Sequence, residues 1–317
     1  MSDPVSEAGT IPVNDSTPIL AYGPLVLDVP GRPVPLAMKV SAPATGTGLP
    51  IILLSHGHGM TTFLSSLRGY GPLADFFAAH GFVVVQPTHL DSTALGLRES
   101  DHPEAPTFWK SRPAEISFII DHLDDIEAAV PGLAGRLDTT RVAAVGHSLG
   151  GHTVALLRGM QTRDPADGST VRVPDERIKA AVIIATPGEA DEQTNQDMLN
   201  NYPVNKYNDF STMGMDALVV AGDKDLNPMF SDRLSYRWDA YTRAPGPKTL
   251  LMVHGAEHIF GGISGYDASE TTDEDPERVS TLRALIWAYL RSQLYPDDPA
   301  WNRALAAMGD FGTVEAK

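Results

Sequence analysis

Apolar runs alternate with amphipathic stretches along most of the chain. Runs that are apolar throughout, as expected of strands buried on both faces of a parallel sheet, lie at 51–54, 82–85, 142–145, 178–185, 217–221 and 250–253. Between them, the spacing of apolar residues predicts helices over 73–80, 113–129, 229–243 and 276–294. This alternation predicts an α/β fold, in which a mostly parallel, doubly wound sheet of about eight strands carries helices on both faces.

The beginning of the chain follows a different pattern. Residues 1–18 are rich in Ser, Thr, Pro and acidic residues, and we expect them to form a loose arm. Strand-like segments at 19–29 and 34–41 are separated by a Pro-Gly-Arg-Pro turn, which predicts an antiparallel hairpin. We expect residues 19–317 to form one domain, because the segment shows no internal repeat and its length suits one large core.

Charge and composition narrow the class of function. The 317-residue chain has a formal net charge of −16, which argues against nucleic acid as a partner because phosphate binding needs a basic surface. It has no cysteine, which excludes disulfides, thiolate metal sites and a cysteine nucleophile. The sequence contains no pattern of a membrane span or a secretory signal, so we expect a cytoplasmic protein. A mature exported form without its signal would read the same.

The segment Gly146-His147-Ser148-Leu149-Gly150-Gly151 carries the strongest chemical signal. It follows the apolar run at 142–145 and precedes the apolar residues of a helix, so it predicts a sharp strand-to-helix turn. Such a turn holds Ser148 above the edge of the sheet, and the flanking glycines avoid side-chain clashes. The alternative is a glycine-rich turn that contains an incidental serine.

Polar residues follow three other apolar runs, and ligands of parallel sheets bind beyond these carboxyl ends of the strands. The segments are Ser55-His56-Gly57-His58-Gly59, Gly222-Asp223-Lys224-Asp225 and His254-Gly255-Ala256-Glu257-His258. Together with the serine turn they give the chain order serine, acid, histidine. This is the order of the catalytic residues in α/β-hydrolases.

These motifs resemble the α/β-hydrolase superfamily over nearly the whole chain, from about residue 19 to 295. Within it they are similar to bacterial dienelactone-hydrolase-like proteins and to relatives of platelet-activating-factor acetylhydrolase. The resemblance implies an α/β-hydrolase fold with Ser148 as the nucleophile, His258 as the general base and Asp225 as the acid that orients it.

The chemistry of ester cleavage requires such a trio. A serine hydroxyl is a weak nucleophile near neutral pH, so a base must take its proton during attack. An imidazole can accept and return a proton because its unperturbed pKa is about 6.5, and a buried carboxylate fixes its tautomer. An oxyanion hole needs two N–H donors. We expect one from the backbone of Leu149 and, by the resemblance, the other from the backbone of His58.

Several residues compete for these roles. His254 and His152 are alternative histidines for which a packing role is simpler. Asp223 is an alternative acid, although its position suits a turn. Some acetylhydrolase relatives carry the acid one strand earlier, where Glu189 and Asp191 stand in this chain.

The segment 55–59 also offers two histidines as candidate metal ligands. His56 and His58 suggest a metal pair, but the loop lacks the third ligand that such a site needs. We therefore expect neither a metal nor a cofactor.

Two long irregular stretches, at 86–112 and 187–215, are expected to cover the site. The side chains expected to line the substrate pocket are Trp109, Phe108, Phe210 and Met213. The alternative is that these apolar side chains fill small cores of their own.

The sequence thus predicts a cofactor-free, esterase- or lipase-like serine hydrolase that cleaves a small-molecule carboxylic ester through an acyl-enzyme. An amidase, thioesterase or lactone hydrolase would use the same trio, and a non-catalytic binding protein could share the fold. The acyl and alcohol groups and the oligomeric state are left open.

Overall fold

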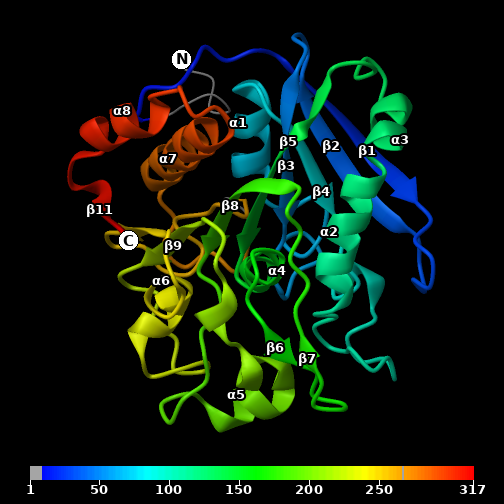
Figure 1. Ribbon diagram of the computed structural model, residues 1–317, viewed down its shortest axis with the longest axis vertical. Coiled ribbons are helices and arrows are strands. Elements are labelled where there is room, and N and C mark those ends of the chain that lie inside the picture. The colour runs from blue at the N-terminus through cyan, green and yellow to red at the C-terminus, as the bar shows by residue number, and fades with distance from the viewer. Residues whose placement is uncertain (1–8, 266–267) are drawn as a thin grey trace.

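A nine-stranded sheet runs through the centre of the computed structural model, which describes residues 9–265 and 268–317 (Figure 1). The strands lie in the order β1 (Ile19–Leu27), β2 (Leu36–Pro43), β4 (Val83–Pro87), β3 (Leu49–Ser55), β5 (Leu137–His147), β8 (Ile178–Ile184), β9 (Leu218–Gly222), β10 (Thr249–Val253) and β11 (Gly312–Ala316). The six strands from β4 to β10 are parallel, whereas β1, β2 and β11 pair antiparallel. The fold is α/β with a mixed sheet and an N-terminal antiparallel hairpin.

Helices cover both faces of this sheet. One face carries α1 (Gly71–Ala79), α7 (Pro276–Leu294) and α8 (Ala300–Ala307), and the other carries α2 (Ser111–Asp121), α3 (Leu123–Ala129), α4 (Leu149–Leu157) and α6 (Asp239–Thr242). Figure 1 shows α1, α7 and α8 together on one side and α2 and α3 on the other. No helix within the described residues is long and apolar enough to cross a lipid bilayer.

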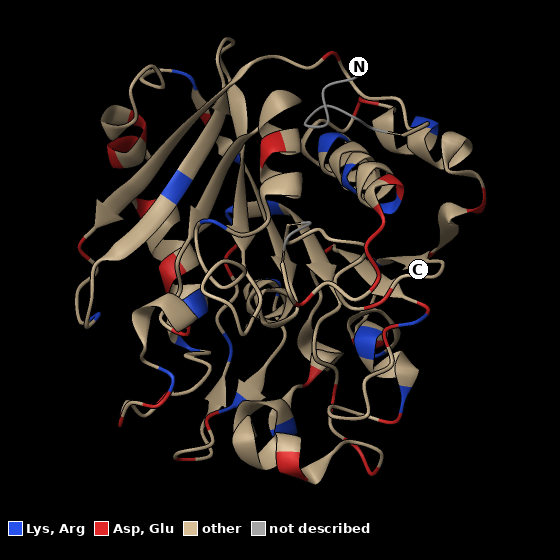
Figure 2. Cartoon of the chain, turned by 180° about the vertical axis from the view of Figure 1, so that it is seen from behind, with Lys and Arg blue, Asp and Glu red and all other residues tan. Residues whose placement is uncertain are grey.

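The alternation of side chains along each strand divides the core in two. In β3, Ile52 and Leu54 belong to the core under α1 and α7, whereas Ile51 and Leu53 belong to the core under α2 and α4. Both sets are buried because successive side chains of a strand point to opposite faces. Figure 2 accordingly shows charged residues mainly on the helices and loops, with few on the central strands.

The described part of the predicted arm, residues 9–18, lies on the face of the sheet that carries α1 and α7. Ile11 is buried in the core that α7 covers, and the backbone N–H of Thr17 donates to the carbonyl of Ala79, 2.9 Å away. These contacts hold the segment next to the end of α1. Residues 1–8 of the predicted arm lie outside the described residues.

Two predicted helices differ in the structure. The helix expected over 113–129 is interrupted at His122, which separates α2 from α3. The helix expected over 229–243 is helical only in η4 (Leu234–Trp238) and α6. Its first part bonds to another segment instead, because the N–H of Asn195 donates to the carbonyl of Phe230 at 2.9 Å.

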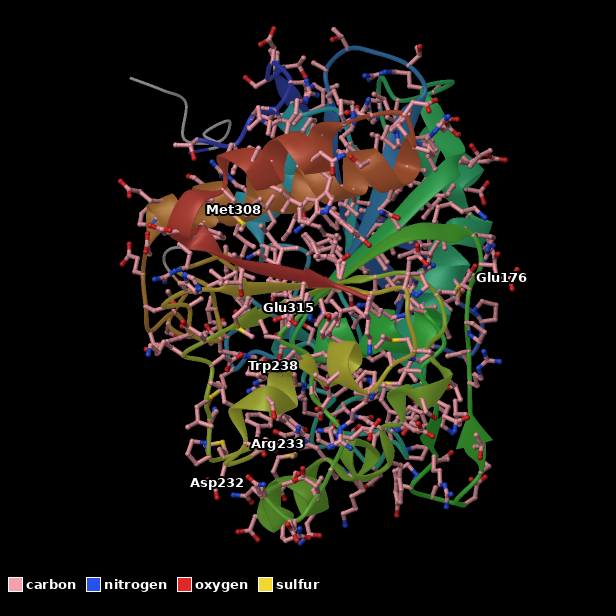
Figure 3. All side chains as sticks on the ribbon, turned by 60° about the vertical axis from the view of Figure 1, so that its left-hand side comes forward. Glu176, Asp232, Arg233, Trp238, Met308 and Glu315 are labelled. Carbon is pink, nitrogen blue, oxygen red and sulfur yellow. The ribbon has the colours of Figure 1, made fainter. Side chains whose placement is uncertain are left out.

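The end of the chain adds two elements to those that were predicted. Helix α8 packs against α7, and β11 then returns to the sheet beside β10. Figure 3 shows Met308 near the end of α8 and Glu315 on β11 at the edge of the sheet. The strand β11 thereby pairs the edge that β10 would otherwise leave open.

The two predicted covers contain short helical segments and fold onto the domain. The first contains η1 (Thr93–Leu95), and the second contains α5 (Gln196–Asn201), η2 (Pro203–Tyr207) and η3 (Phe210–Thr212). Phe210 of the second cover is fully buried in the core under α2 and α4, whereas Tyr207 of the same cover is exposed.

Replacing Phe210 with Ala is therefore expected to lower the free energy of unfolding by about 3–5 kcal/mol, because it empties a packed site. Tyr207→Ala serves as the control and is expected to change it by less than about 0.5 kcal/mol. Denaturant unfolding of both variants measures the difference. Equal losses would contradict this assignment of Phe210 to the core.

Candidate active site

Ser148 occupies the turn between β5 and α4 in a strained backbone conformation. Its φ of 56° and ψ of −119° are unusual for a residue with a side chain. Its N–H donates to the carbonyl of Ile184 at 2.8 Å, which ties the turn to the end of β8. The strain is thus maintained by the surrounding sheet.

Glycines two positions before and two positions after Ser148 allow this turn to pack closely. A Cβ on Gly146 would lie 2.0 Å from the carbonyl oxygen of Gly150, and a Cβ on Gly150 would lie 2.0 Å from the carbonyl oxygen of Ser55. Only glycine fits at either position. The turn therefore rests against the end of β3, and a Cβ on Gly57 would lie 3.3 Å from Cβ of Ser148.

An acid and a histidine meet at the ends of β9 and β10. Nδ1 of His258 donates to Oδ2 of Asp225 at 2.8 Å. The side chain of Asp225 is buried, whereas that of His258 is 30% exposed. No described residue forms a hydrogen bond with Nε2 of His258, so this nitrogen is available to a ligand.

Arg237 completes the surroundings of Asp225. Its Nε lies 3.3 Å from Oδ1 of Asp225, and its guanidinium lies over the ring of Phe230. Burial would raise the pKa of Asp225, but the charges of His258 and Arg237 outweigh it and lower that pKa below its usual value. The carboxylate therefore stays ionised, which suits an acceptor for the imidazole N–H.

Tyr70 and His147 connect the loop after β3 to the histidine loop. The hydroxyl of Tyr70 accepts the N–H of Gly57 at 3.0 Å and donates to Nδ1 of His147 at 2.7 Å. Nε2 of His147 then donates to the carbonyl of His258 at 2.8 Å. Burial lowers the pKa of His147 to about 3, so its ring stays neutral and can both accept and donate.

One cavity of about 500 Å³ brings the predicted site residues together. Ser148, Asp225 and His258 line it, as do His58 and Leu149. No described residue accepts a hydrogen bond from the backbone N–H of His58 or of Leu149, the first residue of α4. Two free amide donors therefore flank the serine, as an oxyanion site requires.

The predicted pocket residues lie elsewhere. Trp109, Phe210 and Met213 are buried in the core under α2 and α4, and Phe108 is fully buried with its ring against His102. None of the four lines the cavity. They fold inwards because their large apolar side chains gain more from the core than from a solvent-open wall.

Other side chains form the walls of the cavity instead. They include Met60, Leu64, Tyr202, Asn205, Leu226, Met229 and Phe230. Tyr202 and Asn205 come from the predicted cover at 187–215, but the residues at 226–230 do not. These residues were not predicted to line the cavity, because the apolar spacing from residue 229 onwards predicted a helix there.

The alternative acids have other partners. Asp223 accepts the N–H of Gly255 at 2.7 Å, as a turn residue would. Asp191 pairs with Nε of Arg233 at 2.7 Å, and Glu189 accepts the N–H of Phe210 at 2.8 Å. Figure 3 shows Arg233 on the segment before η4. None of these carboxylates is bonded to His258.

The alternative histidines also have local partners. His254 donates from Nδ1 to the carbonyl of Asp310 at 2.9 Å, and His152 bonds through Nε2 to the side chain of Asn208 at 2.9 Å. Both contacts are structural. Neither histidine lines the cavity that contains Ser148.

His56 and His58, the possible metal pair, form hydrogen bonds with different partners. Nδ1 of His56 donates to the carbonyl of Gly57, and its Nε2 accepts the N–H of His89, so both ring nitrogens are engaged. Nδ1 of His58 is bonded to Asp91. Among residues 9–265 and 268–317, no group of three or more His, Asp or Glu is arranged to hold a metal ion.

Compared with known proteins, the chain matches no protein-family model and no curated protein sequence.

Proposed function

We propose that this chain is a serine hydrolase of the α/β-hydrolase superfamily that cleaves carboxylic esters through an acyl-enzyme intermediate. The observation that carries the proposal is the hydrogen bond between His258 and the buried Asp225 in the cavity that Ser148 also lines. The strained turn at Ser148 and the chain order serine, acid, histidine add support.

Each group has a defined task in this mechanism. Nε2 of His258 takes the proton of the Ser148 hydroxyl as its Oγ attacks the ester carbonyl. The carbonyl oxygen becomes an oxyanion, which accepts hydrogen bonds from the free N–H groups of His58 and Leu149. The imidazolium of His258 then protonates the departing alcohol, and a water molecule activated by the same ring releases the acid.

Asp225 and Arg237 act on the histidine. The Asp225 carboxylate accepts the Nδ1–H of His258, which keeps the Nε2 lone pair towards the cavity, and it stabilises the imidazolium once formed. Arg237 touches neither substrate nor His258 in this mechanism. It is a positioning residue, because it fixes the carboxylate and favours its ionised form.

The same residues would also hydrolyse thioesters, lactones or amides. Amide leaving groups are poorer and need stronger protonation by His258. A p-nitrophenyl ester compared with the p-nitroanilide of the same acid separates an esterase from an amidase. A binding protein would turn over neither substrate and would not react with a fluorophosphonate.

Replacing Ser148 with Ala is expected to reduce ester turnover by about 10⁶-fold and to abolish fluorophosphonate labelling, because the nucleophile is lost. The melting temperature should not fall. Ser211→Ala, at an exposed serine of the second cover, is the control and should keep both ester turnover and fluorophosphonate labelling. A Ser148→Ala variant with a tenth of the original turnover would refute the assignment.

Asp225→Asn is expected to lower kcat by about 10³- to 10⁴-fold, because the amide cannot hold the required tautomer of His258. Asp223→Asn, Asp191→Asn and Glu189→Gln should each cost less than about tenfold, since their carboxylates bond elsewhere. Steady-state kinetics of the four variants identify the acid. A crippled Asp191 or Glu189 variant beside an active Asp225→Asn would place the acid after β8.

Chelation provides a separate test of the proposed chemistry. EDTA is expected to leave ester turnover unchanged, because the mechanism uses only protein groups. Inactivation that added zinc reverses would contradict the proposal and support the metal pair at His56 and His58.

A further inference from the structure

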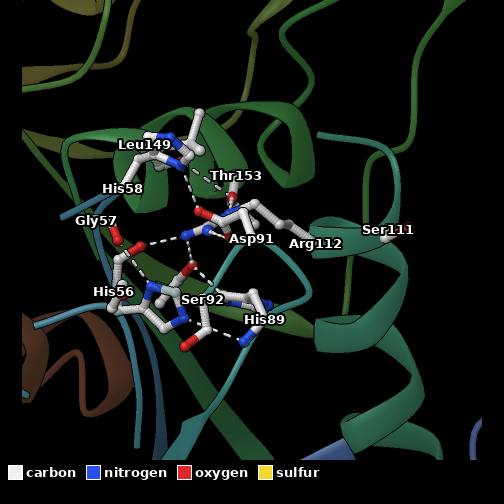
Figure 4. Close-up of polar contacts among 12 residues, drawn as sticks. His56, Gly57, His58, His89, Asp91, Ser92, Ser111, Arg112, Leu149 and Thr153 are labelled. Carbon is white, nitrogen blue, oxygen red and sulfur yellow. Dashed lines mark hydrogen bonds and ion pairs between the residues drawn. The ribbon is translucent and has the colours of Figure 1, made fainter. Parts of the chain in front are cut away.

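A second Asp–His pair reaches the same cavity through its histidine, and the two side chains have no task in the mechanism above. Nδ1 of His58 donates to Oδ2 of Asp91 at 2.8 Å (Figure 4). The two residues are 33 positions apart in the sequence, the same separation as in the pair of Asp225 and His258. The ring of His58 lines the cavity with 15% of its side chain exposed, whereas Asp91 is fully buried.

The buried side of this pair is rigidly held. Arg112, which is also fully buried, forms an ion pair with Oδ1 of Asp91 and donates to the carbonyl of His56. Its Nε donates to the hydroxyl of Thr153 on α4 at 3.0 Å. Figure 4 shows these contacts converging beneath His58 and Leu149. The cluster therefore joins the loop after β3 to the helix that Ser148 precedes.

The contacts of Asp91 determine its ionisation and the tautomer of His58. Burial would raise the pKa of Asp91, but the charge of Arg112 and the bond from His58 outweigh it and lower that pKa. Because the N–H at Nδ1 of His58 donates to Asp91, the tautomer of the ring that forms this bond presents Nε2 as a hydrogen-bond acceptor.

Nε2 of His58 is available to a ligand. No described residue forms a hydrogen bond with it, and Tyr202 approaches the ring edge-on with centroids 5.7 Å apart. A ligand that donates a hydrogen bond to this nitrogen gains binding free energy, because an unsatisfied polar group in a partly enclosed cavity is unfavourable. The natural donor in this cavity is a group on the substrate.

The order of the strands indicates which part of the substrate lies there. Ser148 follows β5, His58 follows β3 on one side of it, and Asp225 follows β9 on the other side, beyond β8. The leaving alcohol must face His258, which protonates it. The acyl group therefore extends towards His58.

We infer that His58 is a substrate-binding residue, and that the preferred substrates are esters whose acyl group carries a hydroxyl close to the scissile carbonyl. The inference rests on the proposed function and narrows its substrate class. The hydroxyl donates to Nε2 of His58, while the carbonyl oxygen of the same acyl group accepts the backbone N–H of His58. One residue thus contacts both groups of a hydroxyacyl ester.

The test compares p-nitrophenyl butyrate with p-nitrophenyl 2-hydroxybutyrate and 3-hydroxybutyrate. The measured quantity is the ratio of kcat/KM for each hydroxy ester to that for the plain ester. Comparing this ratio between variants cancels the intrinsic reactivity of each ester. Two substitutions at position 58 separate the two ring nitrogens.

His58→Asn keeps a donor near the position of Nδ1, so the contact with Asp91 is retained while Nε2 is lost. We expect the ratio for at least one hydroxy ester to fall about tenfold, the effect of one net hydrogen bond, with little change in melting temperature. His58→Gln instead keeps an amide near the position of Nε2 and loses the donor to Asp91. It should retain more of the preference but melt at a lower temperature.

An unchanged ratio in His58→Asn for both hydroxy esters would overturn the inference. If the plain and hydroxy esters lost activity equally in that variant, the ring would serve turnover and not recognition of the hydroxyl. Fluorophosphonate labelling of Ser148 keeps the two proposals apart. If the unaltered protein is labelled and the ratio does not change, the serine hydrolase stands and the hydroxyacyl preference fails.

Discussion

The site depends on one close contact between two backbones. Gly150, at the beginning of α4, lies so near the end of β3 that a single Cβ would collide with the carbonyl oxygen of Ser55. This approach sets the distance between the turn that carries Ser148 and the loop that carries His58. The free amides of His58 and Leu149 flank the same serine only because nothing larger than hydrogen separates the two segments.

The sequence predicted the parts of the structure that depend on local pattern. The strand-to-helix turn at Ser148 could be recognised because strand, glycines and helix are contiguous there. The helix α7 has the predicted bounds, since Asp275 caps it and Pro276 begins it. The pairing of Asp225 with His258 was expected from the resemblance to α/β-hydrolases, and their side chains do form a hydrogen bond.

Features that depend on distant partners could not be predicted in this way. Residues 229–233 have helical spacing, yet their backbone bonds to the segment around Asn195. The aromatic residues of the covers were expected to line the pocket, but they do not. This could not be foreseen, because sequence does not tell which way an irregular segment turns its side chains. The contacts of Arg237 with Asp225 and of Asp91 with His58 likewise join segments whose proximity only the folded chain reveals.

The connection through Tyr70 and His147 has a consequence for cooperativity. One phenol oxygen and one imidazole join the backbone of Gly57 to the backbone of His258, although the two loops follow strands at different positions in the sheet. A displacement of either loop breaks or strains the same short chain of hydrogen bonds. The two loops therefore hold each other in place, because neither can move alone without losing hydrogen bonds that also fix the other.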